Sequence, residues 1–166
     1  MSETKDNTSP VIQEVTKHDI TSAVAVAGHP IHAMSVHFPI ALVIGTLGLD
    51  LLYWFSGDPF FLRASVWSAG SAFILGVAAA IVGTAELLLV RGIRSRVGSW
   101  THAVAAMTLL AIAGTNWGVR LVAPDEVLPH GLALSVLASI FTGIAGWHGG
   151  KLVFDHGVGL MVSPKK

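Results

Sequence analysis

The sequence contains no cysteine among its 166 residues. This absence excludes disulfide bonds, thiolate metal sites, iron–sulfur ligation, covalent c-type haem attachment and thiol catalysis. Charged residues are also scarce, at 12% of the chain, whereas a soluble domain usually carries about 25%. Together with a 52% share of hydrophobic residues, this shortage indicates a membrane protein.

Several further signals are missing. The first 20 residues lack the basic start and apolar run of a secretory signal peptide, so we expect a polar amino-terminal tail over residues 1–27. Ten basic residues balance ten acidic ones, which gives no sign of nucleic-acid binding. The motifs of serine hydrolases, zinc peptidases and P-loop enzymes do not occur, and the sequence leaves open whether the protein is an enzyme.

Long apolar segments make up most of the remaining chain. They run over about Phe38–Phe55, Ala64–Val90, His102–Val122 and His130–Trp147. Each has about the length that a helix needs to cross a bilayer. The breaks between them are short and rich in turn formers, so neighbouring spans must be antiparallel. The sequence predicts an all-α membrane protein, an up-down four-transmembrane-helix bundle over residues 28–160, followed by a short basic tail over 161–166.

The basic residues predict an orientation in the membrane. Most of them lie at the end of the bundle that carries the amino terminus: Lys5, Lys17, Arg91, Arg94, Arg96, Lys151, Lys165 and Lys166. Only Arg63 and Arg120 lie toward the other end. Because loops rich in Lys and Arg stay in the cytoplasm, we expect a multi-pass protein with both termini cytoplasmic.

Six of the eight histidines lie near this same end: His29, His32, His37, His102, His148 and His156. Three of the six fall within the stretch GHPIHAMSVHFPI, residues 28–40. Of the other two, His18 lies in the tail and His130 at the opposite end. Six imidazoles from three parts of the chain, gathered at one depth, predict a common site.

A b-type haem is the first interpretation of that site. It needs one or two neutral imidazoles from facing helices, with small residues beside the macrocycle. His37 and His102 sit at similar depth on the first and third spans, so we expect them to be the axial pair. Pro30 and Pro39 predict an interrupted backbone, which would bring His32 and His37 together.

Two other interpretations remain open. The same histidines, with Glu86 near the end of the second span, could form a non-haem site for copper, iron or zinc. A carboxylate inside a membrane is itself a reason to suspect function. Alternatively, the chain is a cofactor-free structural or assembly subunit whose histidines and arginines contact a partner complex.

Three motifs resemble domain-of-unknown-function family 2231, a bacterial family of predicted four-helix membrane proteins. The motifs are GHPIH (28–32), VHFPI (36–40) and GWHGGKLVFDHGVG (146–159), and the resemblance covers about residues 28–160. Glu86 matches the acidic residue late in the second span of the family, and His102 matches a histidine that opens the third span. Ala33 replaces the second proline of the usual opening, and His148 stands where members usually carry an aliphatic residue.

The resemblance implies which positions belong to the site: His29, His32, His37, Glu86, His102 and His156. Some members are joined to Rieske-type or cytochrome domains, which implies a redox role. We therefore expect an electron-transfer subunit of a bacterial inner membrane, with haem b on His37 and His102. His156 is the reserve ligand, and His29 and His32 are expected to bind propionates or orient a ligand. The expected partners are the lipid bilayer, a redox protein or membrane complex, and a quinone.

Overall fold

Four long helices dominate the computed structural model, which describes residues 10, 13, 17 and 20–160. They are α3 (His37–Ser56), α4 (Pro59–Leu89), α6 (Val97–Val122) and α7 (His130–Phe154). The shorter elements are β1 (Ala25–Val26), β2 (His29–Pro30), α2 (Ile31–Ser35), α5 (Arg91–Arg94) and the 3-10 helix η1 (Pro124–Val127). The predicted tail over 161–166 lies outside the described residues.

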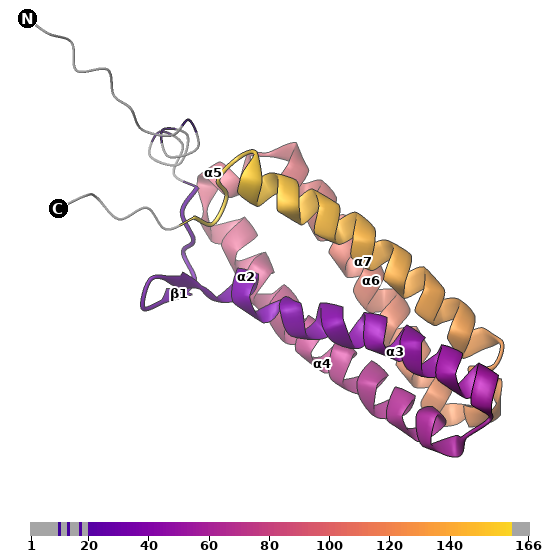
Figure 1. The fold of residues 1–166 in the computed structure, drawn as a ribbon. Helices are drawn as coiled ribbons and strands as arrows, with labels where there is room; N and C mark the ends of the chain where they lie inside the picture. Colours follow the sequence, from indigo (N-terminus) through magenta and orange to yellow (C-terminus); the bar gives the residue numbers. More distant parts are fainter. Residues whose placement is uncertain (1–9, 11–12, 14–16, 18–19, 161–166) are drawn as a thin grey trace, which may run out of the picture.

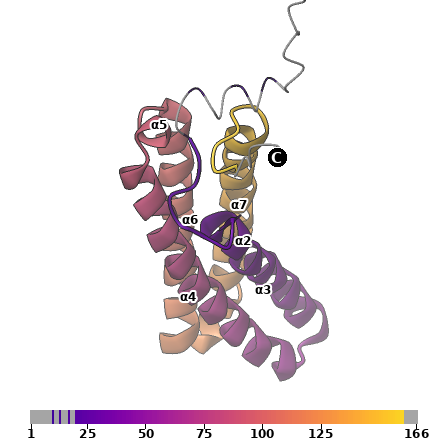
Figure 2. The same cartoon turned by 90° about the vertical axis from the view of Figure 1, so that its left-hand side faces the viewer.

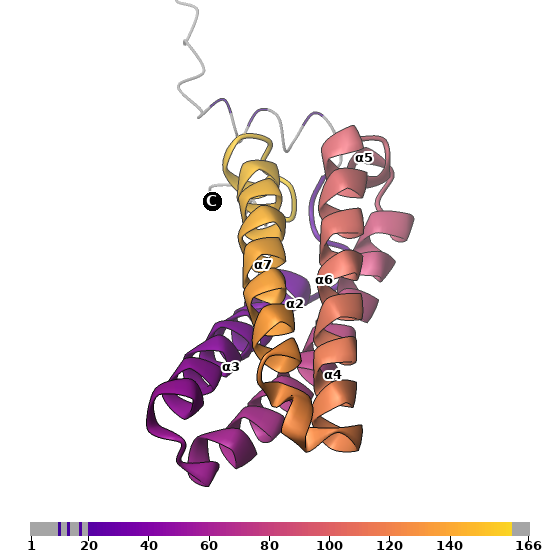
Figure 3. The same cartoon turned by 90° about the vertical axis from the view of Figure 1, so that its right-hand side faces the viewer.

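The long helices form an up-down bundle (Figures 1 and 3). α3 packs against α4 and α7, and α6 packs against the same two helices, so α3 and α6 stand diagonally across the bundle. All four spans, with the first counted from Ile31, are long and apolar enough to cross a membrane. The predicted fold class is confirmed.

The bundle has an apolar outside and an interior of small and polar residues. Large side chains such as Trp67 and Trp147 are more than two-thirds exposed, at 79% and 71%. The buried residues midway along the bundle are Val43, Ala72 and Ala138. An apolar surface of this extent suits contact with lipid, and small interior residues let helices approach closely without a hydrophobic driving force.

Three helices extend five or more residues beyond their predicted limits. α6 begins at Val97 rather than His102. α4 begins at Pro59, five residues before the predicted start at Ala64. The Asp58 carboxylate accepts a hydrogen bond from the Phe60 N–H at 2.8 Å, and a proline in the first turn needs no N–H partner. α7 continues past Trp147 to Phe154. In lipid, ending the helix early would leave backbone groups without partners.

The opening stretch is less broken than predicted. The one residue between α2 and α3, Val36, has helical dihedral angles of φ −63° and ψ −22°. Pro39 falls in the first turn of α3, where its missing N–H does no harm. The expectation that a break brings His32 and His37 together is therefore wrong. Five residues apart on nearly continuous helix, the two side chains diverge by about 140°.

Ile20 and Ser22 are buried against the bundle, although the sequence predicted a polar tail up to residue 27. Ile20 is 0% exposed and packs with Leu87, Val90 and Ile93, and its carbonyl accepts from the Gly159 N–H at 2.8 Å. Figure 2 shows this indigo segment running from the α5 end down to α2. It thereby covers the end of the bundle at which the first span begins.

Candidate functional site

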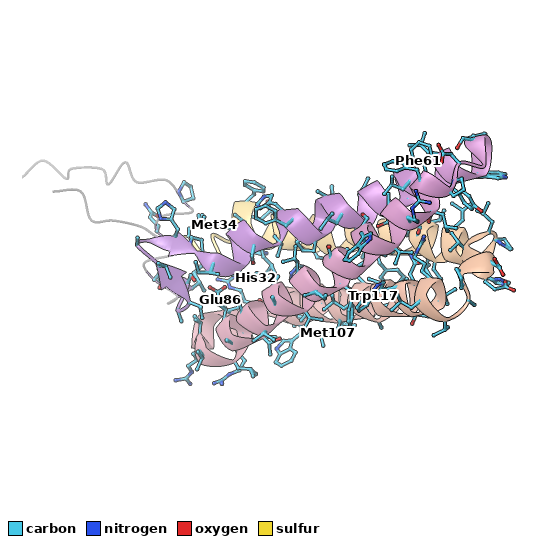
Figure 4. The ribbon with its side chains drawn as sticks, turned by 90° about the horizontal axis from the view of Figure 1, so that it is seen from below. His32, Met34, Phe61, Glu86, Met107 and Trp117 are labelled. Atoms are coloured by element: carbon cyan, nitrogen blue, oxygen red, sulfur yellow. The ribbon has the colours of Figure 1, made fainter. Side chains whose placement is uncertain are left out.

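Two imidazoles meet inside the bundle, and we call them the histidine pair. His32 comes from α2 and His102 from α6, and their ring centres are 6.3 Å apart with the planes at 76°. Both residues are partly buried. Since the first span and α6 are diagonal partners, the histidine pair lies across the middle of the bundle. Figure 4 shows His32 and Glu86 at the same end of the bundle, away from Trp117 and Phe61.

Each ring of the pair is held by the backbone of a neighbouring helix. His32 Nδ1 lies 2.9 Å from the Ala79 carbonyl oxygen on α4, and His102 Nδ1 lies 3.0 Å from the Ala145 carbonyl oxygen on α7. A carbonyl oxygen only accepts, so Nδ1 donates in both rings and a neutral ring carries its proton there. No described residue forms a hydrogen bond to either Nε2. This tautomer leaves Nε2 available to bind a metal.

Two glycines make room for the rings. A Cβ on Gly83 of α4 would lie 2.6 Å from His32 Cε1, and one on Gly149 of α7 would lie 3.0 Å from His102 Cε1. Each glycine comes four residues after the residue whose carbonyl accepts the hydrogen bond, because Ala79 precedes Gly83 as Ala145 precedes Gly149. An Ala-x-x-x-Gly segment therefore supplies both a carbonyl and a flat surface to each imidazole, in the same way on both sides.

Other polar groups border the pair. His148, partly buried on α7, is close enough to His102 for the two rings to interact electrostatically. Glu86 is buried on α4 and accepts a hydrogen bond from the Ser22 hydroxyl. The Ser99 hydroxyl, one turn before His102, is buried and has no hydrogen-bond partner among the described residues. Within that part of the chain, no three His, Asp or Glu side chains come together as ligands for one metal ion.

The remaining predicted site residues lie on the outside. His29, His37 and His156 are exposed. His37 Nδ1 is 3.2 Å from the carbonyl oxygen of Met34, on the preceding turn, and His29 Nδ1 is 2.9 Å from that of Ala27. The structure brings His32 to His102, and it does not bring His37 there.

The histidine pair lies near the end of the bundle at which the first span begins. His32 is the second residue of that span, and His102 is the sixth residue of α6, about 8 Å from its start at the helical rise. Ala79 stands ten residues before the end of α4, and Ala145 stands nine residues before the end of α7. α4 and α7 therefore extend beyond the imidazoles at this end.

A second polar cluster, the arginine centre, occupies the opposite end of the bundle and was not predicted. Its members are Asp50, Ser65, Asn116, Arg120 and Ser135, all at most 3% exposed. Arg120 forms a bidentate ion pair with Asp50, with nitrogen–oxygen distances of 2.7 and 2.6 Å. Its remaining contacts are with the Ser65 and Ser135 hydroxyls at 2.6 and 3.0 Å and with Asn116 Oδ1 at 3.1 Å.

The sequence does hold a signal for the arginine centre. Asp50 lies six residues before the end of the first span, and Arg120 lies two residues before the end of the third. Both spans end on the same side, so opposite charges at comparable depth should pair inside a membrane. Asn116, four residues before Arg120 and hence on the same helical face, supports that expectation.

Comparison with known proteins assigns the chain to a family. The sequence model of the family described as "Predicted membrane protein (DUF2231)" matches residues 28–161. The chain belongs to this family. No curated protein matches it, and no solved structure does. The membership confirms the resemblance drawn from the three motifs, and the family description states residence in a membrane and no activity.

Proposed function

We propose that the protein is a b-type cytochrome-like electron-transfer subunit whose haem is bound between His32 and His102. The observation that carries the proposal is the histidine pair itself: two imidazoles from diagonal helices, each with Nδ1 bonded to a backbone carbonyl and Nε2 open. The axial role predicted for His37 passes to His32 because His37 is exposed.

The two imidazoles are close enough for one group to reach both, because their ring centres are 6.3 Å apart. A b-type haem needs one or two imidazoles from the protein, so His32 and His102 would be sufficient to hold it. This favours haem over a non-haem ion, for which the described residues offer no third ligand.

The surroundings of the pair fix the two rings in place and leave one buried hydroxyl without a partner among the described residues. The backbone of α4 and α7 approaches the rings only because Gly83 and Gly149 have no side chain. The buried Ser99 hydroxyl, on the same side of α6 as His102, has a hydrogen bond to offer. A group with acceptor oxygens beside the ring of His102 would take it.

The residues of the site have distinct tasks in this proposal. His32 and His102 would hold the iron through Nε2, and the Ala79 and Ala145 carbonyls orient the rings and make Nε2 a stronger ligand. When bound, the haem supplies reversible one-electron oxidation and reduction. With both His32 and His102 committed to the haem, the site would suit electron transfer rather than oxygen chemistry.

The basic residues support an orientation for this subunit. Arg120 is buried in an ion pair with Asp50, so Arg63 remains as the exposed basic residue of the described chain at the far end. Arg91 and Arg94 are exposed at the end near the histidine pair. By the positive-inside rule, both termini then lie in the cytoplasm of a bacterial inner membrane. Electrons would reach the site from a partner protein at that face, or from a quinone.

An absorption spectrum of the detergent-purified protein tests the proposal. The protein is expressed with a haem precursor, and it is measured oxidised and after dithionite reduction, with metal analysis of the same sample. We expect a Soret band that sharpens on reduction, resolved α and β bands, and about one iron per chain. A colourless protein that also fails to take up added haemin, or one that holds copper or zinc instead, would overturn it.

A further inference from the structure

An apolar groove runs along the outside of the bundle between α4 and α6. Its volume is about 550 Å³, within the range of small-molecule sites. The lining includes Leu87 of α4 and Trp100, Val104, Met107 and Ala111 of α6. Met107 is 58% exposed, and it marks the outer side of α6 in Figure 4. The groove therefore opens toward the surrounding lipid and is separate from the histidine pair.

The groove has the length of one membrane leaflet. From Trp100 to Ala111 it follows eleven residues of α6, about 16 Å at the helical rise. Half of a hydrocarbon core of about 30 Å is about 15 Å. The Trp100 end lies three residues from the start of α6, where the chain meets the membrane surface. An extended acyl chain anchored at that surface would thus run the whole groove.

Two arginines lie in the connection between the two helices of the groove. Arg91 and Arg94 belong to α5, which joins α4 to α6, and both are exposed. Trp100 Nε1 donates to the Arg94 carbonyl at 2.9 Å, and an Arg94 guanidinium nitrogen donates to the Leu88 carbonyl at 3.0 Å. These bonds tie the basic loop to the groove wall, and the guanidinium groups keep further donors to offer to an anion.

From this arrangement we infer that the α4–α6 groove binds an anionic glycerophospholipid. The phosphate binds Arg91 and Arg94, and one acyl chain fills the groove beside Trp100 and Met107. Guanidinium groups bind phosphate oxygens in a bidentate manner, and basic sites between transmembrane helices on the cytoplasmic side are typical of lipid headgroup recognition. Trp100 at the interface fits the same depth. A helix from a second copy of the chain would use the apolar groove but would leave both arginines without an anion.

Native mass spectrometry of the detergent-purified protein tests this inference. The probe is an equimolar mixture of phosphatidylglycerol and phosphatidylcholine with identical acyl chains, titrated into the wild-type protein. We expect one phosphatidylglycerol to be retained per chain in preference to phosphatidylcholine, with retention that falls at high salt. Equal retention of the two lipids, or a lipid-free dimer at all lipid concentrations, would overturn the inference.

Matched variants locate the site. Arg91→Gln/Arg94→Gln should weaken phosphatidylglycerol binding about 30-fold, since each basic residue near an anionic headgroup contributes about fivefold. Met107→Trp should weaken it by filling the groove. Arg63→Gln, at the other end of the bundle, is the control and should bind as the wild type does. Unchanged binding in both the arginine and the groove variants would contradict the assignment, and the comparison of lipids on wild-type protein does not depend on any variant folding.

Discussion

The arginine centre and the histidine pair are both polar clusters inside one apolar bundle, and they differ in how fully their hydrogen-bonding groups are used. In the arginine centre all three guanidinium nitrogens donate and both Asp50 oxygens accept. In the histidine pair one nitrogen of each ring is bonded to a carbonyl and the other is open. A network without spare groups can only stabilise the fold, whereas an oriented ring with an open nitrogen can bind a ligand. Inside a membrane, an oriented side chain with an unused nitrogen is thus a better sign of function than a charged side chain whose groups are all paired.

Breaking the arginine centre should have the largest effect on stability. Asp50→Ala leaves the Arg120 guanidinium charged and unpaired, and we expect unfolding to become easier by about 3–5 kcal/mol. In the double variant Asp50→Leu/Arg120→Met both charges are gone, so most of that loss should be recovered. Thermal unfolding in detergent measures both. A double variant less stable than either single variant would show that the ion pair is not what holds this end together.

Crowding the histidine pair should have the next largest effect, and it should act on the cofactor. Gly83→Ala places a Cβ 2.6 Å from His32 Cε1, so we expect a loss of about 1–3 kcal/mol and a lower haem content. Gly149→Ala should be milder, because its contact is 3.0 Å. Gly143→Ala, also on α7, is the control, because its Cβ meets nothing within 4 Å. Equal haem content in all three variants would show that Gly83 and Gly149 do not affect haem binding.

Weakening the contact between residues 20–24 and the bundle should have a smaller effect on stability. Ser22→Ala removes the hydroxyl that donates to buried Glu86, which should reduce stability by about 1–3 kcal/mol locally. Amide hydrogen exchange over residues 20–24 should accelerate, while the helices exchange as before. Ser56→Ala removes an exposed hydroxyl bonded to its own helix and serves as the control. Unchanged exchange in Ser22→Ala would mean that the Glu86 contact does not hold the segment.

The smallest effect is expected at His130, an exposed histidine near the arginine-centre end of the bundle. His130 Nδ1 lies 2.5 Å from Glu126, and the two side chains are 68% and 53% exposed. Exposed ion pairs contribute less than about 1 kcal/mol. His130→Ala should therefore leave the unfolding temperature and the haem content near those of the wild type. A large loss of haem in this variant would show that the histidine pair is not the only imidazole site.

The four helices could be predicted because the length and apolarity of a segment are enough to indicate a membrane span. Which side chains meet inside the bundle depends on how each helix is rotated about its axis. His37 was predicted as a ligand because it stands at a depth similar to that of His102 on the third span. With Val36 helical, the phase carries His32 inward and His37 outward. The Ala-x-x-x-Gly segments at 79–83 and 145–149 were visible in the sequence as small residues, and only the contacts reveal that they hold imidazoles.

The segment before the first span is a second feature that was predicted wrongly from the sequence. Residues 1–19 are mostly polar, whereas residues 20–27 are mostly apolar, and Ile20 is fully buried against Leu87 and Val90. A tail boundary at residue 27 overlooks this change of composition. The change at Ile20 is thus the signal in the sequence for a segment that packs on the bundle.

The most direct test of the central claim compares haem content per folded chain in His32→Ala and His37→Ala. The two residues lie five positions apart in one span and differ in the structure by facing inward or outward. The account predicts that His32→Ala, like His102→Ala, loses its haem, while His37→Ala retains as much as the wild type. Haem lost from His37→Ala but kept by His32→Ala would contradict it and return the axial role to His37.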